Sequence, residues 1–407
     1  MRFIAAFVVL LSHVELTLGL MGLPNRWSNP WADLEESGEA HLWNAYNGDI
    51  LKLLHAFSHE MGAMAVIFFF VLSGFLITLL LLREKEVRGT IDIKRFYIRR
   101  VLRIWPLYFL VVLLGLYVLP HCGEAFYVKS QSPNLLGDWR VLDLPYLVIL
   151  PNLSTGLMLG SFPPNIGHAW SIGVEEQFYL FWPWLFLLIK SRPKWLIAFI
   201  VAVVAIKFIA LQLEWPRWLQ IFLVTMKFES MAIGGIGAFL YHHGWLNGIR
   251  NQAYWLLALM GMIGVVTTFC FCPKSIQDAL FLVQSGFFLI VILAGVKSPN
   301  PLPKGIKKYL AWLGQRSYGI YMWHMSMMTL SAYLLEALEI EKYAVAVLWM
   351  VVISSALTFL LSYLSYRWFE MPFLRMKNRF TPVAYSDNRQ PLHPYTNRTP
   401  TRSDASP

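Results

Sequence analysis

Cysteines and charged residues are both scarce in this chain. Its three cysteines, Cys122, Cys270 and Cys272, are too few and too irregularly spaced for a disulfide framework, and a C-x-C pair supplies only two ligands of a zinc site. Charged residues make up 14% of the sequence, whereas about 25% is usual in soluble domains. These scarcities exclude an ordinary soluble domain and predict neither a disulfide scaffold nor a metal centre.

Long apolar runs dominate instead, because 57% of the 407 residues are hydrophobic. A helix needs about 20 mostly apolar residues to cross a hydrocarbon core about 30 Å thick, and such stretches recur along almost the whole chain. The first run resembles a signal peptide, but no small-residue cleavage site follows, and His13 and Glu15 interrupt it. We therefore expect a retained first helix in an all-α, polytopic membrane protein.

Ten segments have the length and apolar character of transmembrane helices: 3–21, 62–82, 103–120, 170–189, 195–213, 218–240, 253–272, 276–296, 310–334 and 343–366. A further apolar stretch, 144–162, is broken by prolines, glycines and an asparagine, and we interpret it as re-entrant or interfacial. The polar residues 376–407 have too little apolar surface to fold. We therefore predict a transmembrane domain over 1–375 and a disordered cytoplasmic tail over 376–407.

Basic residues concentrate in alternate loops. The segment after the second predicted span is the most basic, with Arg83, Lys85, Arg88, Lys94, Arg95, Arg99, Arg100 and Arg103. Cytoplasmic loops of membrane proteins carry an excess of Lys and Arg, so this pattern places most of the 34 basic residues and both termini in the cytoplasm. The net charge of +10 is thus a topology signal, and it gives no reason to expect a nucleic-acid partner.

A few ionisable side chains lie inside the predicted spans. Inserting a charged residue at the centre of a membrane helix costs roughly 2.5 to 3.5 kcal/mol of free energy. Arg2 and His13 stand about three helical turns apart, which returns them to one face of the first helix, about 16 Å apart along its axis. This aligns a positive charge at the cytoplasmic mouth with an imidazole deep in the membrane. A histidine satisfied by its neighbours in the core is the structural alternative.

Three arginines cluster at the cytoplasmic start of the third span, in IKRFYIRRVLRIWP (93–106). Arg99 and Arg103 stand at i and i+4, and Arg100 lies beside them. Guanidinium groups bind phosphates through a bidentate fork, so the cluster predicts a site for a phosphorylated ligand. A plain topology signal, with binding of lipid head groups, is the alternative interpretation.

Five segments together resemble the acyltransferase-3 family, membrane-bound O-acyltransferases related to bacterial polysaccharide acetylases. They are RFIAAFVVLLSHVE (2–15), FFFVLSGFLI (68–77), RFYIRRVLRIWPLY (95–108), HAWSIGVEEQFYLFWP (168–183) and SYGIYMWH (317–324), in family order. Two positions depart from the family pattern, because Phe3 and Ser326 stand where Gly and Pro are common. Many relatives also carry an esterase-like domain after the membrane region.

The resemblance implies that acyl-coenzyme A, most plausibly acetyl-coenzyme A, docks from the cytoplasm as a co-substrate, with no bound cofactor. Its phosphates would contact Arg2, Arg99, Arg100 and Arg103. His13 would act as general base on an acceptor hydroxyl or take the acyl group itself. Glu175 or Glu176 would orient the imidazole, with a structural ion pair to Arg316 or a lysine as the alternative role.

The resemblance also implies a carbohydrate or glycolipid acceptor and a place in the bilayer of a bacterial inner membrane. Residues expected on the acceptor side are Trp170, Ser171, Tyr179 and His324. A transporter that uses buried His, Glu and Lys residues is the main alternative, but it gives no reason for three arginines at one cytoplasmic mouth. A scaffolding protein would not need ionisable residues inside several spans, so we favour the acyltransferase.

We predict from the distribution of charge that a membrane-impermeant thiol reagent, applied to intact cells, modifies Glu36→Cys and leaves Arg88→Cys unmodified. Both variants are made in a background without the native cysteines. Modification at residue 88 but not at residue 36 would overturn the predicted topology.

Overall fold

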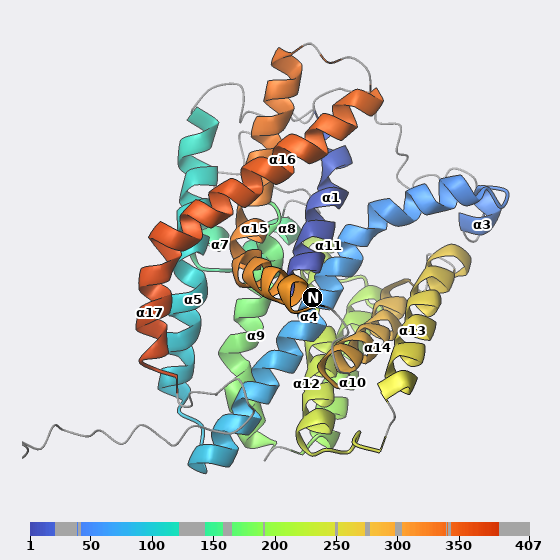
Figure 1. The fold of residues 1–407 in the computed structure, drawn as a ribbon. Helices are drawn as coiled ribbons and strands as arrows, with labels where there is room; N and C mark the ends of the chain where they lie inside the picture. The colour runs from blue at the N-terminus through green and yellow to red at the C-terminus, as the bar shows by residue number, and fades with distance from the viewer. Residues whose placement is uncertain are drawn as a thin grey trace, which may run out of the picture.

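The computed structural model describes residues 1–20, 39, 42–121, 143–157, 165–189, 192–248, 251–272, 277–297, 303–338, 340 and 343–381. Within these ranges the chain forms helices and turns and no strand, which confirms the predicted all-α fold (Figure 1). Seven helices of this described part are long and apolar enough to cross a membrane. The chain is therefore a polytopic membrane protein.

All ten predicted spans are helical, but the count of ten membrane crossings is not confirmed. Eight correspond to one main helix each: α1 (Arg2–Leu20), α4 (Ile50–Arg88), α5 (Ile93–Leu113), α9 (Ala169–Leu188), α10 (Lys194–Gln212), α13 (Asn251–Phe271), α14 (Gln277–Lys297) and α16 (Tyr343–Ser365). The span predicted at 310–334 lies within the longer α15 (Lys304–Ala337). Three of these helices, α1, α9 and α15, are not among the seven, and they carry His13, the two glutamates and His324.

The remaining predicted span, 218–240, is divided into α11 (Arg217–Thr225) and α12 (Phe228–His242). The break coincides with Lys227 and Glu229, two charged residues in an apolar segment. The carboxylate of Glu229 pairs with Lys207 of α10 at 2.8 Å, and the ammonium of Lys227 lies 4.0 Å from the centre of the Phe281 ring. Both charges at the break are therefore used in contacts with neighbouring helices.

The apolar stretch 144–162 forms two short helices, α7 (Asp143–Leu147) and α8 (Pro151–Leu157). Between them Ile149 has a positive φ of 61°, a strained value for a β-branched residue. Helix α8 packs against α9 and α11. The stretch is thus broken into two short helices, with Pro151 as the first residue of the second, and its last residues lie outside the described part. Its re-entrant or interfacial placement stays a prediction.

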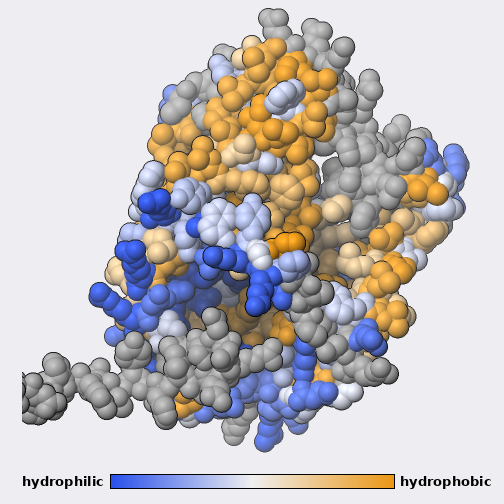
Figure 2. All heavy atoms as spheres, in the orientation of Figure 1, coloured by the Kyte–Doolittle hydropathy of each residue, from blue (hydrophilic) through white to orange (hydrophobic). Residues whose placement is uncertain are grey.

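Helix α16 continues through a π-helical turn (Tyr366–Glu370) into α17 (Met371–Asn378), which packs against α5 (Figure 1). The predicted tail begins inside α17, and its residues 382–407 lie outside the described part. Hydrophilic side chains gather in the lower half of this face of the molecule, at the level of α17 and the start of α15, below a hydrophobic upper part (Figure 2).

Helices α4 and α12 make the most extensive helix contact in the described structure, and two glycines allow their backbones to approach closely. A Cβ on Gly74 would lie 1.8 Å from the carbonyl oxygen of Met231, and one on Gly234 would lie 2.0 Å from that of Val71. Gly74 is the glycine of the FFFVLSGFLI segment. That motif therefore has a packing role at the centre of the bundle.

We expect Gly74→Ala to destabilise the protein by about 1 to 3 kcal/mol, because the added methyl group forces the two backbones apart. Gly286→Ala on α14 is the matched control, since nothing lies within 4 Å of the position of its Cβ. The measurement is the melting temperature of each purified variant in detergent. Equal melting temperatures for the two variants would show that the close approach is not required.

Candidate active site

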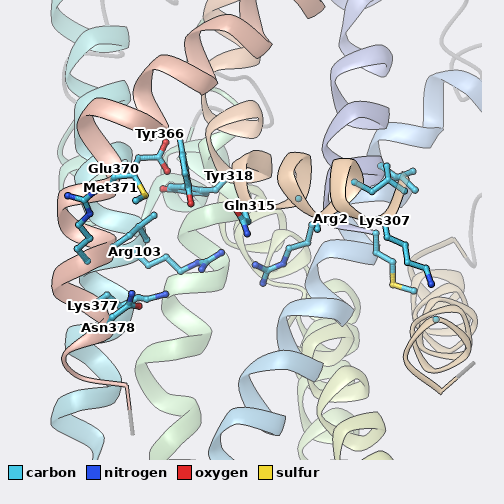
Figure 3. A pocket seen from close by; sticks show the side chains of 18 of the residues that line it. Arg2, Arg103, Lys307, Gln315, Tyr318, Tyr366, Glu370, Met371, Lys377 and Asn378 are labelled. Atoms are coloured by element: carbon cyan, nitrogen blue, oxygen red, sulfur yellow. The ribbon is translucent and has the colours of Figure 1, made fainter. Parts of the chain in front are cut away.

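A large cavity opens between the starts of α1 and α15 and the end of α16 with α17. It has a volume of about 1140 Å³. Its described lining has one acidic residue, Glu370, and five basic ones: Arg2, Arg103, Lys307, Arg375 and Lys377 (Figure 3). We call it the cationic cavity. A surplus of positive charge from four separate helices is suited to a ligand with several negative charges.

A second, narrower pocket continues inward from the cationic cavity. Its volume is about 80 Å³, and Arg2, Arg103 and Tyr318 line both spaces. Its other polar lining residues come from α4, α5, α9 and α15: Ser73, Arg100, Ser171, Glu175, Tyr179, Ser317 and Tyr321. We call it the inner pocket. The structure thus brings Arg2, Arg100 and Arg103 together with Glu175, Ser171 and Tyr179.

Arg99, in contrast, lines neither space. One of its terminal nitrogens forms a buried ion pair with Glu84 of α4 at 2.7 Å, and the other donates to the carbonyl oxygen of Phe380 at 3.0 Å. The i, i+4 spacing with Arg103 therefore does not give the two arginines a common ligand. Helix α4 supplies the carboxylate that holds Arg99 in a structural role.

Glu175 and Glu176 face different spaces. Glu175 lines the inner pocket, where its carboxylate accepts a hydrogen bond from Tyr179 at 3.1 Å, and Tyr179 is hydrogen-bonded in turn to Ser73. Glu176 lines a separate groove and accepts a hydrogen bond from Trp105 Nε1 at 2.8 Å. Neither glutamate forms an ion pair with a described residue. Of the two, only Glu175 belongs to the inner pocket.

Arg316, one suggested partner for the glutamates, is held by aromatic rings instead. Its guanidinium lies 3.9 Å from the centre of the Trp312 ring and 4.6 Å from that of Tyr366. It also donates to the carbonyl oxygen of Trp312 at 2.8 Å. These cation–π contacts stabilise the junction of α15 with the π-helical turn.

His13 belongs to a cluster of three histidines. Its ring centre lies 5.2 Å from that of His324 on α15, and His324 lies 4.7 Å from His168, which immediately precedes α9. His13 Nδ1 lies 2.7 Å from the carbonyl oxygen of Val9, and His324 Nδ1 lies 2.5 Å from that of Tyr321. Because a carbonyl can only accept, each Nδ1 carries a proton, which leaves the lone pair on Nε2 when the ring is neutral.

Polar contacts link the inner pocket to this histidine cluster. The hydroxyl of Tyr321, which lines the inner pocket, is 2.6 Å from that of Ser171 and donates to the backbone carbonyl of His168 at 3.2 Å. The Nε2 atom of His324 is buried without a hydrogen-bond partner among the described residues. Trp170 is half-buried and packs edge-on against Phe70, with ring centres 6.0 Å apart, and it lines neither the cationic cavity nor the inner pocket.

Sequence reasoning missed residues of the histidine cluster and of the cationic cavity. His168 stands at the start of a motif that contains five other candidates, so its position was the available signal. Lys307 and Lys377 were interpreted as parts of a cytoplasmic loop and the tail, and only the fold brings them beside Arg2 and Arg103. In the part of the chain that the structure describes, no group of three His, Cys, Asp or Glu side chains is arranged to hold a metal.

The fold and the site define a polytopic membrane protein in which a cationic cavity joins an inner pocket, and Tyr321 links that pocket to a cluster of three histidines. Residues 1–367 match the family model for the acyltransferase domain, so the chain belongs to the acyltransferase-3 family. This confirms the resemblance carried by the five motifs.

The chain is 28% identical over 332 residues to the peptidoglycan O-acetyltransferase OatA of Listeria monocytogenes, a match that covers 76% of this chain and 51% of that protein. It is 27% identical over 335 residues to a putative peptidoglycan O-acetyltransferase, YrhL, of Bacillus subtilis, covering 76% and 50%. A putative O-acetyltransferase of Staphylococcus aureus is similarly related, at 27% over 330 residues, covering 77% and 52%. The chain thus spans about half the length of these relatives. No solved structure matches it.

Proposed function

We propose that this protein is an O-acyltransferase that moves an acyl group, for which we favour acetyl, from acyl-coenzyme A to a hydroxyl group of a carbohydrate or glycolipid. The main support is the continuity of the cationic cavity with the inner pocket through Arg2 and Arg103. The names of the relatives, O-acetyltransferases of peptidoglycan among them, agree with this reaction class and with a carbohydrate acceptor.

In this proposal the phosphates of the donor bind in the cationic cavity. Arg2 and Arg103 form no ion pair with a described residue, so their guanidinium groups are available for a bidentate contact with phosphate. Lys307 and Lys377 add charge around them. The pantetheine arm then runs into the inner pocket, along α1, toward His13.

His13 acts as the general base. Its Nδ1–H is held by the carbonyl of Val9, so Nε2 is the atom that accepts the proton of the acceptor hydroxyl. The acceptor oxygen forms a bond to the thioester carbonyl carbon, and the carbon–sulfur bond breaks. The proton passes from His13 to the departing thiolate, which leaves as coenzyme A. The carboxylate of Glu175 stabilises the positive charges of Arg2 and Arg100, with which it interacts electrostatically.

We expect His13→Ala to insert and fold normally but to lose roughly a hundred- to ten-thousand-fold in acyl transfer, the usual contribution of a general base. His243→Ala is the matched control, because His243 also donates from Nδ1 to the carbonyl four residues before it, that of Phe239, but lies outside the site. The assay follows acetyl transfer from radiolabelled acetyl-coenzyme A in membranes. Near-normal transfer by the His13 variant would remove His13 from the mechanism.

We expect Arg103→Lys to raise the apparent KM for acetyl-coenzyme A by roughly ten- to a hundred-fold, because lysine keeps the charge but loses the bidentate fork. Arg99→Lys is the comparison: this residue lies one turn earlier but contacts Glu84 instead of either cavity, so its KM should stay unchanged. Both constants come from donor titrations at matched protein levels. Equal KM values for the two variants would indicate that the arginine cluster marks the cytoplasmic side and does not bind the donor.

A further inference from the structure

A groove on the outer surface runs between α5, α9 and the connection of α7 with α8. It has a volume of about 350 Å³, and its walls are largely apolar, with Val101, Phe109, Leu147 and Leu150 among the lining residues. Two further lining residues, Leu180 and Val148, are 66% and 54% exposed. Because α5 is long and apolar enough to cross a membrane, hydrocarbon chains would contact this lateral groove in a bilayer.

The lateral groove also contains charged groups with unsatisfied atoms. Glu176 lines it, and although Oε2 accepts from Trp105, Oε1 is buried and has no hydrogen-bond partner among the described residues. The Nε atom of Arg100, which also lines the groove, is likewise buried without a partner. Buried polar atoms are normally satisfied, so these two point to a polar ligand group in an otherwise apolar groove.

The lateral groove adjoins the inner pocket. Arg100 and Tyr179 line both spaces, so the two are separated by the thickness of these side chains. A head group that contacts Glu176 from the lateral groove is therefore next to the inner pocket, where the proposed function places the pantetheine arm of the donor.

We propose that the lateral groove is the binding site of a glycolipid acceptor, which enters from the bilayer with its hydrocarbon chain along α5 and α9 and its sugar hydroxyls toward Glu176 and Arg100. An uncharged hydroxyl suits both groups, since it donates to the carboxylate and accepts from the guanidinium. An ammonium head group would be repelled by Arg100, and a phosphate by Glu176. This inference rests on the proposed function and narrows its acceptor to a membrane-borne one.

The test uses the full chain in phosphatidylglycerol vesicles with hexadecyl glucoside that carries a photoreactive diazirine in its alkyl chain. After irradiation without any donor, labelled peptides are identified by mass spectrometry. We expect label within 97–109 and 147–150, and several-fold less of it in Leu180→Trp, which fills the groove. Leu188→Trp is the matched control on the same helix, because Leu188 is 78% exposed and does not line the groove.

Head-group recognition is tested by Glu176→Gln, which keeps the shape of the side chain and removes its charge. We expect it to weaken labelling by the glucoside several-fold while leaving unchanged the label from a phosphatidylcholine with the same diazirine chain. Equal labelling by the two probes in the unmodified protein, with no effect of Glu176→Gln, would mean that the groove holds bulk lipid only and would overturn the proposal.

Binding without donor separates this inference from the proposed function. Selective labelling by the glucoside in a protein that transfers no acyl group would contradict the proposed reaction and support the groove. Transfer to water-soluble methyl glucoside without selective labelling of the groove would support the proposed reaction and contradict the glycolipid site.

Discussion

The cost of placing charge in a low-dielectric interior is the constraint on which this structure depends. Some charged groups meet an opposite charge, as in the pairs Arg99–Glu84 and Lys207–Glu229, and others, such as Arg316, lie against aromatic rings. Another group of cations has no such partner within the described residues and converges on one inner pocket: Arg2, Arg100 and Arg103. Ion pairs thus hold Arg99 and Lys207 within the bundle, whereas Arg2, Arg100 and Arg103 gather around a pocket.

Most of the fold follows from the sequence, because a bilayer requires long apolar helices and the chain has little else. The division of the span 218–240 does not follow from apolar length, since it coincides with Lys227 and Glu229 contacting other helices. The extension of α4 back to Ile50 and the π-helical turn after Ser365 were also missed. Such features depend on tertiary contacts, which cannot be read from the local pattern of apolar and polar residues.

The site was predicted less completely, for reasons of geometry. Spacing placed Arg99 and Arg103 on one face of a helix, but it could not show that Glu84 lies opposite the first of them. Adjacent residues on a helix point about 100° apart, and the packing of α9 places Glu175 in the inner pocket and Glu176 in the separate groove. Lys307 and Lys377 lie in a predicted loop and the predicted tail, and only the tertiary fold places them in the lining of the cationic cavity.

The hydrogen bond between His13 and the carbonyl of Val9 has a consequence for how this site can evolve. The group that fixes the imidazole tautomer belongs to the main chain, so any side chain that keeps the helix intact at position 9 provides it equally well. A search for covarying partners of His13 would therefore find no signal there. The helix itself sets the orientation of the His13 imidazole.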